Sequence, residues 1–315
     1  MTSPLRITER ENPASASLDT KTTPEILRII NREDSRVAAA VRRTIPDITR
    51  AVDLIVQGFE RGGRLVYIGA GTSGRLGVLD AAECIPTFGS DRVVGVMAGA
   101  PESLYKPIEG VEDDPRQAVR DLLRIKLNRR DVLVGISASG RTPYALAGMR
   151  YARRLGATVL AITANPDAPM RRLATVTIAT VVGPEVIAGS TRMKAGTAQK
   201  LALNMLSTAS MVRVGRVLSS WMVNLRMNSE KLKKRGQGML AKATGASPAV
   251  AAQTLKASGG NLPVALLMIW KNVGRPEAHR WLEKGKNPAA VLRQAQSEWK
   301  SQASARKSGT ARRGV

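Results

Sequence analysis

Hydrophobic residues change their spacing along the chain near residue 65. Before that point they recur at helical intervals, which predicts helices beginning at Thr23, near Asp34 and after Pro46. Beyond it, short continuous apolar runs predict five strands, at Leu65–Ile68, Val93–Met97, Val132–Ile136, Thr158–Ile162 and Val176–Ile178. Strands that alternate with helices favour a parallel sheet, and runs without polar alternation favour strands covered on both faces. We therefore predict an α/β fold, a three-layer α/β/α sandwich with a five-stranded parallel sheet.

The segments that flank this region differ in composition. Residues 1–20 are polar and predict a flexible N-terminal arm, so the α/β domain is expected to span residues 21–235. Glycine and proline breaks after residue 240 predict a small unit of three short helices over residues 240–297. Residues 298–315 are basic and rich in Ser, Ala and Gly, which predicts a disordered tail.

Composition narrows the function classes. Hydrophobic residues make up 43% of the 315 residues, enough to bury a core, whereas aromatic residues make up only 3%, few for a protein that stacks on bases. With Cys84 as its one cysteine, and one histidine, the chain has no internal disulfide and no His/Cys metal cluster. Its longest apolar run is far shorter than the roughly 20 residues of a membrane helix, and no secretion signal begins the chain. We expect a cytoplasmic protein without a membrane partner.

The chain is strongly basic. Lysine and arginine number 49 against 25 acidic residues, a net charge of +24, which favours anionic partners such as phosphorylated substrates or nucleic acid. A solvated surface without a partner explains the same balance. Nucleic-acid binding through the basic C-terminal region remains an alternative, but we do not expect it to be the main function.

A glycine-rich loop follows the first predicted strand. Residues 69–75 read GAGTSGR and match the dinucleotide fingerprint G-x-G-x-x-G. That fingerprint also requires an acidic residue at the end of the second strand, where this chain has Met97-Ala98-Gly99. We therefore expect no nicotinamide cofactor.

A second loop has the same character. Residues 137–143 read SASGRTP, follow the third predicted strand and open a helix. Both loops combine hydroxyls with small residues at a helix N-terminus, where free N–H groups and the helix dipole favour a phosphate. Ordinary helix capping is the alternative for each loop. Two such loops at the ends of parallel strands favour a phosphorylated small ligand held by Thr72, Ser73, Ser137, Ser139 and Thr142.

These loops resemble those of the sugar isomerase (SIS) domain, which binds phosphorylated sugars. The pattern I-S-x-S-G-x-T of that superfamily maps onto Ile136, Ser137, Ser139, Gly140 and Thr142. Longer segments, LVYIGAGTSGRLGVLDAAECIPTFG, IEGVEDD, GISASGRTPY and GSTRMKAGTAQKLALNMLSTASM, resemble the N-acetylmuramic acid 6-phosphate etherase family. The resemblance covers roughly residues 7 to 295. The segment after residue 240 resembles a ubiquitin-associated (UBA-like) three-helix fold.

This resemblance implies a bacterial lyase of peptidoglycan recycling. It implies that N-acetylmuramic acid 6-phosphate and water give N-acetylglucosamine 6-phosphate and D-lactate, by elimination and hydration, in a homodimer with neither metal nor cofactor. Removing the proton at C2 of the open-chain sugar and expelling lactate from C3 requires one base and one acid. The family pattern assigns the acid to Glu83 and the second catalytic carboxylate to Glu112.

Each carboxylate also has a structural explanation. Glu83 could be a plain acidic residue near the end of an alanine-rich helix, although the helix dipole disfavours an acid there. Glu112 could belong to a solvated acidic helix start with Asp113 and Asp114, and Glu109 is the residue most easily mistaken for it.

A third segment, residues 189–200, resembles the substrate pocket of the family. Its basic residues stand in the first turns of a predicted helix, where a bound anion explains them better than folding does. Ser190, Arg192 and Lys194 are therefore candidate binding residues, with a buried cap and surface charge as the alternative.

Two other functions remain open. A non-catalytic regulator that senses sugar phosphates would share the loops but would not need both Glu83 and Glu112. An aldose–ketose isomerase would share the pocket and also remove a proton at C2.

Overall fold

The computed structural model describes residues 7–224, 227, 229–285 and 287–311. The chain divides into two compact units, each described by itself. The first comprises Met1–Glu83 and Asp91–Ser210, and the second comprises Cys84–Ser90 and Met211–Val315.

The first unit is built on a five-stranded parallel sheet, which confirms the predicted fold class. Its strands, in the order β2-β1-β3-β4-β5, are β1 (Leu65–Gly69), β2 (Val93–Met97), β3 (Val132–Ile136), β4 (Thr158–Thr163) and β5 (Val176–Ala179). All five residues of β1 and of β3 are buried, because helices cover both faces of the sheet. Each strand lies within one residue of its predicted bounds.

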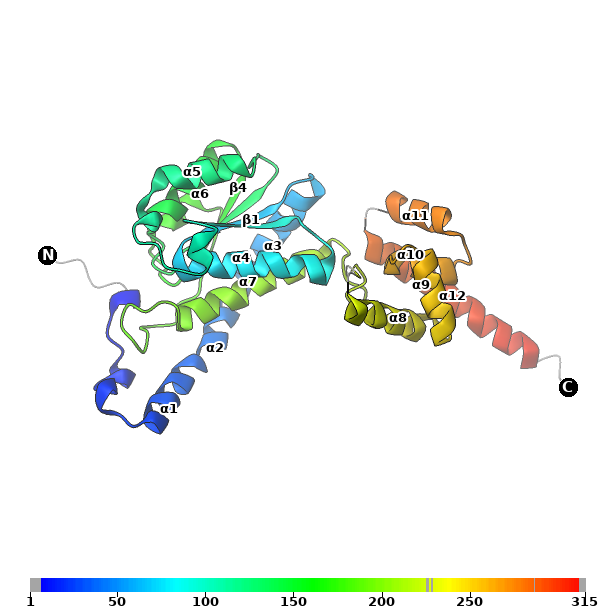
Figure 1. Cartoon of the computed structure of the whole chain (residues 1–315), viewed down its shortest axis with the longest axis horizontal. Helices are drawn as coiled ribbons and strands as arrows, with labels where there is room; N and C mark the ends of the chain where they lie inside the picture. Colours follow the sequence, from blue (N-terminus) through cyan, green and yellow to red (C-terminus); the bar gives the residue numbers. More distant parts are fainter. Residues whose placement is uncertain (1–6, 225–226, 228, 286, 312–315) are drawn as a thin grey trace. The chain divides into compact units, whose positions relative to one another are not determined.

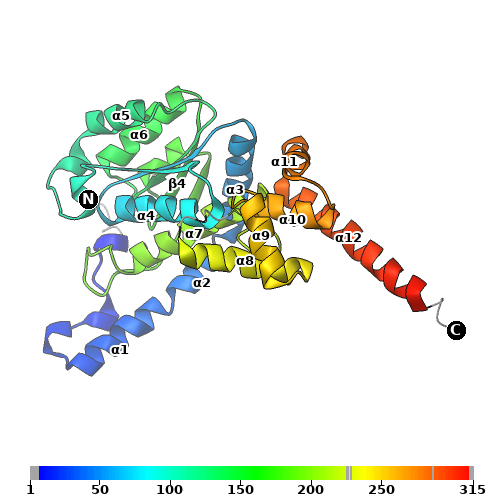
Figure 2. The ribbon, with the colours of Figure 1, turned by 45° about the vertical axis from the view of Figure 1, so that its right-hand side comes forward.

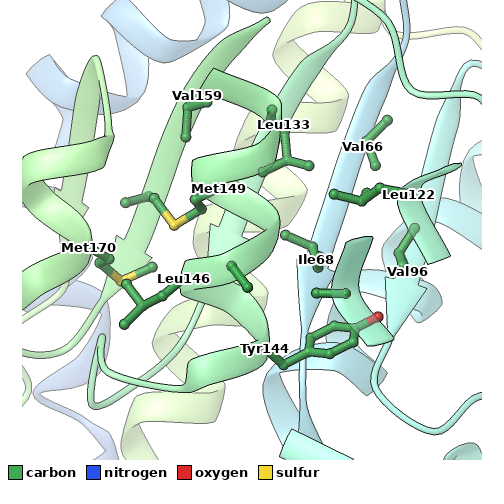
Figure 3. Close-up of a cluster of buried hydrophobic side chains, with 14 of the residues drawn as sticks. Val66, Ile68, Val96, Leu122, Leu133, Tyr144, Leu146, Met149, Val159 and Met170 are labelled. Carbon is green, nitrogen blue, oxygen red and sulfur yellow. The ribbon is translucent and has the colours of Figure 1, made fainter. Parts of the chain in front are cut away.

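Helices sandwich the sheet. On one face lie α3 (Ile45–Glu60), α4 (Gly71–Phe88) and α7 (Lys194–Arg213), and on the other lie α5 (Pro115–Arg124) and α6 (Pro143–Arg154) (Figures 1 and 2). Alternate side chains of β1 point to opposite faces of the sheet. Val66 and Ile68 pack with Leu122 of α5 and Met149 of α6 in the cluster drawn in Figure 3. This apolar layer fixes α5 and α6 against the sheet.

The N-terminal arm is ordered from residue 7 onwards, so the prediction of a flexible arm is wrong for this part. Short 3₁₀ turns at Ile7–Glu9, Pro13–Ser15 and Leu18–Thr20 lead into α1 (Thr23–Asp34), α2 (Val37–Arg42) and α3. Asn12 Nδ2 donates to Glu33 Oε2 (2.8 Å) and to the Pro184 carbonyl (3.0 Å). These partners are distant in sequence, which is why local composition cannot reveal the anchoring. Residues 1–6 lie outside the described part.

Within its described residues from 229 onwards, the second unit has five helices, whereas the sequence predicted three over residues 240–297. They are α8 (Glu230–Thr244), α9 (Pro248–Ala257), α10 (Leu262–Trp270), α11 (Arg275–Lys284) and α12 (Pro288–Ala311). The predicted trio corresponds to α9, α10 and α11, but its core is completed by Leu240 from α8 and Leu292 from α12. A unit of only three helices would leave apolar side chains of α10 exposed to water, because α8 and α12 would not cover them.

The expected tail at residues 298–315 is also corrected, because α12 continues to Ala311. Trp299 packs against the core of the second unit, and Glu298 forms an ion pair with Lys271, so the helix is held at the point where disorder was predicted. Residues 312–315 lie outside the described part. Among the described residues, no helix has the length and apolar character needed to cross a bilayer.

Candidate active site

The two hydroxyl-rich loops lie side by side at the carboxyl edge of the sheet. β1 and β3 are neighbours, with Gly69 opposite Ile136, so the loops that follow these strands start from adjacent positions. The chain turns to β2 on one side of β1 and to β3 on the other, which makes this the switch point of the strand order. Open α/β sheets bind their ligands at such crevices.

Three hydroxyls converge in the second loop. Ser137 Oγ lies 2.8 Å from Thr142 Oγ1 and 3.3 Å from Ser139 Oγ. The loop closes tightly at Gly140, whose φ is +66° and where a Cβ would come within 2.2 Å of Ala168 Cβ. The turn therefore requires glycine and holds the hydroxyls together.

These hydroxyls do not cap the helix that follows them. Thr142 occupies the N-cap position of α6, yet its side chain makes no capping hydrogen bond, and Ser137 Oγ instead accepts from the Gly140 N–H at 3.0 Å. First-turn N–H groups have no partner within their own helix. The capping alternative therefore fails for this loop, and the N-terminus of α6 remains free to bind an anion.

The first loop is joined to α7. Ser73 Oγ donates to Gln199 Oε1 at 3.0 Å, and a Cβ built on Gly196 would lie 3.4 Å from Thr72 Cγ2. Gln199 is 1% exposed, and its Nε2 has no partner among the described residues. A buried amide donor beside a candidate phosphate loop is poised to donate to a ligand.

The third segment divides into exposed and buried parts. Ser190 is half-buried and Arg192 is exposed, whereas Lys194 is 1% exposed and its Nζ lies 2.6 Å from Glu33 Oε2. This geometry gives Lys194 a structural role, because its charge is already neutralised by Glu33. Arg192, unlike Lys194, stays accessible to an anion.

Glu33 and Glu185 complete this buried network. Glu185 accepts from the backbone N–H groups of Lys194 (3.0 Å) and Ala195 (2.8 Å) and so caps α7. Burial raises the pKa of Glu185. Burial also raises the pKa of Glu33, but hydrogen bonds from Lys194 and Asn12 outweigh it and leave that pKa below its ordinary value.

Glu112 lies at the same edge of the sheet as the loops. It is exposed, in a 3₁₀ turn (Val111–Asp113), and the preceding Val111 lies against Gly99, just beyond the end of β2. Asp114 has a structural task instead, because its carboxylate caps α5 through the N–H groups of Arg116 and Gln117. Of the acidic run, Glu112 remains a candidate for chemistry.

Within one chain, Glu83 lies away from the two hydroxyl-rich loops and from Glu112. It is exposed on α4, twelve residues after Gly71. At 1.5 Å per residue, the two positions are about 18 Å apart along the helix axis. α4 runs away from the carboxyl edge, so Glu83 and the loop at residues 70–74 lie near opposite edges of the sheet.

Sequence reasoning missed Gln199. Its position offered a signal, because it shares the buried face of α7 with Ala195, Ala198 and Ala202, where a polar residue needs a partner. No group of three or more His, Cys, Asp or Glu side chains within the described residues could hold a metal ion.

Comparisons with known proteins agree with this geometry. Residues 47–153 match the glucokinase regulatory protein N-terminal SIS domain, and residues 112–209 match the SIS domain. A putative phosphosugar isomerase involved in capsule formation from Bacteroides fragilis shares the fold, with a TM-score of 0.50 and 24% identity over 68% of this chain and 97% of that one.

Relatives named N-acetylmuramic acid 6-phosphate etherase match nearly the whole chain. The protein from Actinobacillus pleuropneumoniae serotype 7 is 49% identical over 88% of this chain and 92% of its own length. The chain belongs to the N-acetylmuramic acid 6-phosphate etherase family. The family member from Rhodopirellula baltica is 48% identical over 87% of this chain and 92% of its own length. The chain is thus an enzyme of the etherase family, as the sequence predicted.

Replacing Lys194 distinguishes a structural role of this buried lysine from a role in substrate binding. Lys194→Met leaves Glu33 buried without its main partner, so we expect the free energy of unfolding in urea to fall by about 3 kcal/mol. Because the pKa of Glu33 is lowered, this stabilisation is present above the ordinary carboxyl pKa of about 4.3 and is lost as the pH falls through the lowered value. Glu33→Gln in the same chain should recover part of the loss. A raised KM at unchanged stability would make Lys194 a substrate ligand instead.

Replacing Gln199 tests whether its side-chain amide contributes to ligand binding beside the first loop. Gln199→Met keeps the volume but removes the hydrogen bonds, so we expect KM to rise about tenfold or more, while kcat changes little. The matched control is Ser210→Ala, which alters another buried, unpartnered group of α7, about 16 Å further along the helix. Equal effects of both variants on KM would show that Gln199 matters only for folding.

Proposed function

We propose that the chain cleaves the D-lactyl ether of N-acetylmuramic acid 6-phosphate with water, giving N-acetylglucosamine 6-phosphate and D-lactate. The observation that carries the proposal is the convergence of Ser137, Ser139 and Thr142 beside the uncapped N-terminus of α6. It occurs in a chain 49% identical to a named etherase. Glu112 lies at the same edge of the sheet.

The reaction needs one base and one acid. In the open-chain sugar the C1 aldehyde acidifies the C2 proton, and a carboxylate removes it. The electron pair then forms the C2–C3 double bond while the C3–O bond breaks, and an acid gives its proton to the departing lactate oxygen. Water adds its oxygen back to C3, and C2 regains a proton. Atoms and charge balance without an oxidant.

The phosphate anchors the substrate at the loops. Thr72, Ser73, Ser137, Ser139 and Thr142 supply hydroxyls, and the start of α6 supplies N–H groups. Arg192, which is exposed, adds positive charge beside the first loop, and Ser190 adds a hydroxyl. Only a few bonds separate the phosphate from C2, so the base belongs at the same edge of the sheet. We assign that role to Glu112.

The acid comes from a second copy of the chain. Glu83 is the other catalytic candidate, but it lies about 18 Å along α4 from the loop of its own chain. A homodimer that sets α4 against the loops of its partner supplies Glu83 in trans.

Exposed apolar side chains support this homodimer. Leu79, one turn before Glu83 on α4, is 50% exposed, and Leu27 on α1 is 59% exposed. α1 projects from the sheet and buries only Glu33 (Figure 1). An amphipathic helix gains stability by burying its apolar face, and a second copy would cover it.

The proposal also assigns a role to each unit and a cellular location to the protein. The first unit supplies the catalytic SIS-type domain, and helices α8 to α12 form a separate helical unit. A sugar phosphate does not cross a bilayer unaided, which favours a location in the bacterial cytoplasm.

Isotope exchange separates the roles of the two carboxylates. With N-acetylmuramic acid 6-phosphate in D₂O, the wild-type chain should release D-lactate and place deuterium at C2 of N-acetylglucosamine 6-phosphate. Glu83→Gln should abolish lactate release but leave C2 exchange, whereas Glu112→Gln should abolish both. Sugar-phosphate binding without lactate would instead indicate a regulator, and a ketose product an isomerase. Near wild-type turnover in both folded variants would refute the mechanism.

Mixed dimers test the contribution of the second copy. When Glu83→Gln and Glu112→Gln chains are refolded together, half of the dimers contain one of each. If Glu83 acts in trans, one site in each mixed dimer is intact, and activity returns to about a quarter of wild type. If both carboxylates act in cis, every site carries one substitution and the mixture stays inactive.

A further inference from the structure

Arginine side chains line two hollows at the outer side of α5 and α6. The first hollow, of about 360 Å³, is a groove whose lining includes Arg116 and Arg120 from α5 and Arg150 and Arg154 from α6. All four side chains are exposed. Figures 1 and 2 show α5 and α6 running side by side over the sheet.

The second hollow lies at the amino edge of the sheet. It has a volume of about 710 Å³ and is lined by Arg61, Asn128, Arg129 and Arg130. A Cβ built on Gly156, just beyond the end of α6, would lie 3.9 Å from Arg129 Cβ. Arg129 of the second hollow therefore lies close to the end of α6, and the seven arginines of the two hollows are together called here the arginine surface.

The charge of the arginine surface is almost uncompensated. No carboxylate lines either hollow. Asp114 pairs with Arg120 at the start of α5 (3.0 Å), and the other six arginines form no ion pair within the described part of the chain. Asp121, the other carboxylate of α5, is buried and accepts from Tyr144. Such a concentration of one sign attracts anions.

The residue types favour phosphodiesters of a duplex. Arg116 and Arg120, like Arg150 and Arg154, stand four residues apart, about 6 Å along their helix axes. Packed helices run 8–10 Å apart, so the four guanidinium groups form two parallel rows. A guanidinium fork matches two phosphate oxygens. No aromatic side chain lines either hollow, so stacking on single-stranded bases has no support.

We propose that the arginine surface binds the backbone of double-stranded nucleic acid without sequence preference. The residues of α6 that line the groove, Ala147 to Arg154, extend about 10 Å, which spans roughly three base-pair steps. The groove between α5 and α6 lies on the face of the sheet opposite α4 (Figure 1), so it stays open when a second copy covers α4. The inference does not depend on the etherase activity.

Salt dependence of duplex binding tests the proposal. Fluorescence anisotropy of a labelled DNA duplex of about 20 base pairs reports Kd for the full-length chain between low and moderate salt. The comparison is wild type against a variant with Arg116, Arg120, Arg150 and Arg154 changed to Gln. Each lost phosphate contact should lower the slope of log K against log salt by about 0.9, so the loss of four contacts should lower it by about 3.6 and weaken binding at every salt concentration. Two unrelated duplexes should bind equally.

A matched variant controls for net charge. Arg235, Arg275, Arg280 and Arg293 are exposed in the second unit, and changing these four to Gln removes the same charge elsewhere. This control should keep the wild-type slope, and unchanged circular dichroism should verify the folding of both variants. Equal loss in both variants would overturn the proposal in favour of diffuse attraction. It would also be overturned if vesicles of phosphatidylglycerol and phosphatidylcholine, but not the duplex, bound through the four groove arginines.

Discussion

The adjacency of β1 and β3 is the constraint on which the site depends. Because the chain turns from β1 to β2 on one side and reaches β3 on the other, right-handed crossovers put α4 and α6 on opposite faces of the sheet. Their N-termini then flank one crevice, with Gly69 opposite Ile136 at its floor. Glycine at 74 is part of the same constraint, since a Cβ there would meet the Gly69 carbonyl oxygen at 2.7 Å. The anion site follows from strand order before any side chain is considered.

Buried polar groups position α7, the helix that contacts the first loop. Glu185 holds the first N–H groups of α7, and Lys194 reaches Glu33 of α1, which also accepts from Asn12. Buried charges of this kind cost desolvation and add little net stability, but they permit one arrangement of their partners. One turn further along, the same helix brings Gln199 to Ser73. The ionic network therefore fixes where α7 meets the phosphate loop.

The sequence predicted the features that depend on neighbouring residues, namely the strands and the loops that follow them. Strand bounds were predictable because each apolar run is followed within two residues by glycine or a polar residue, and the loops because hydroxyls and glycines cluster directly after β1 and β3. Long-range pairing was not predictable: Lys194 reads as a cation at a helix start, and only the fold reveals Glu33, 161 residues away. The ordering of residues 7–20 and of α12 likewise depends on partners that composition does not encode.

In the proposed mechanism, the position of Glu83 would link catalysis to assembly. In one chain Glu83 is exposed beside Leu79, a leucine that is also half uncovered. A second chain that covers Leu79 would shield the carboxyl and bring it to the partner's loops in the same step. On this proposal the apolar face of α4 would stabilise the dimer and position Glu83, so dissociation into single chains would remove the carboxyl from the partner's loops while leaving the hydroxyls of each loop together.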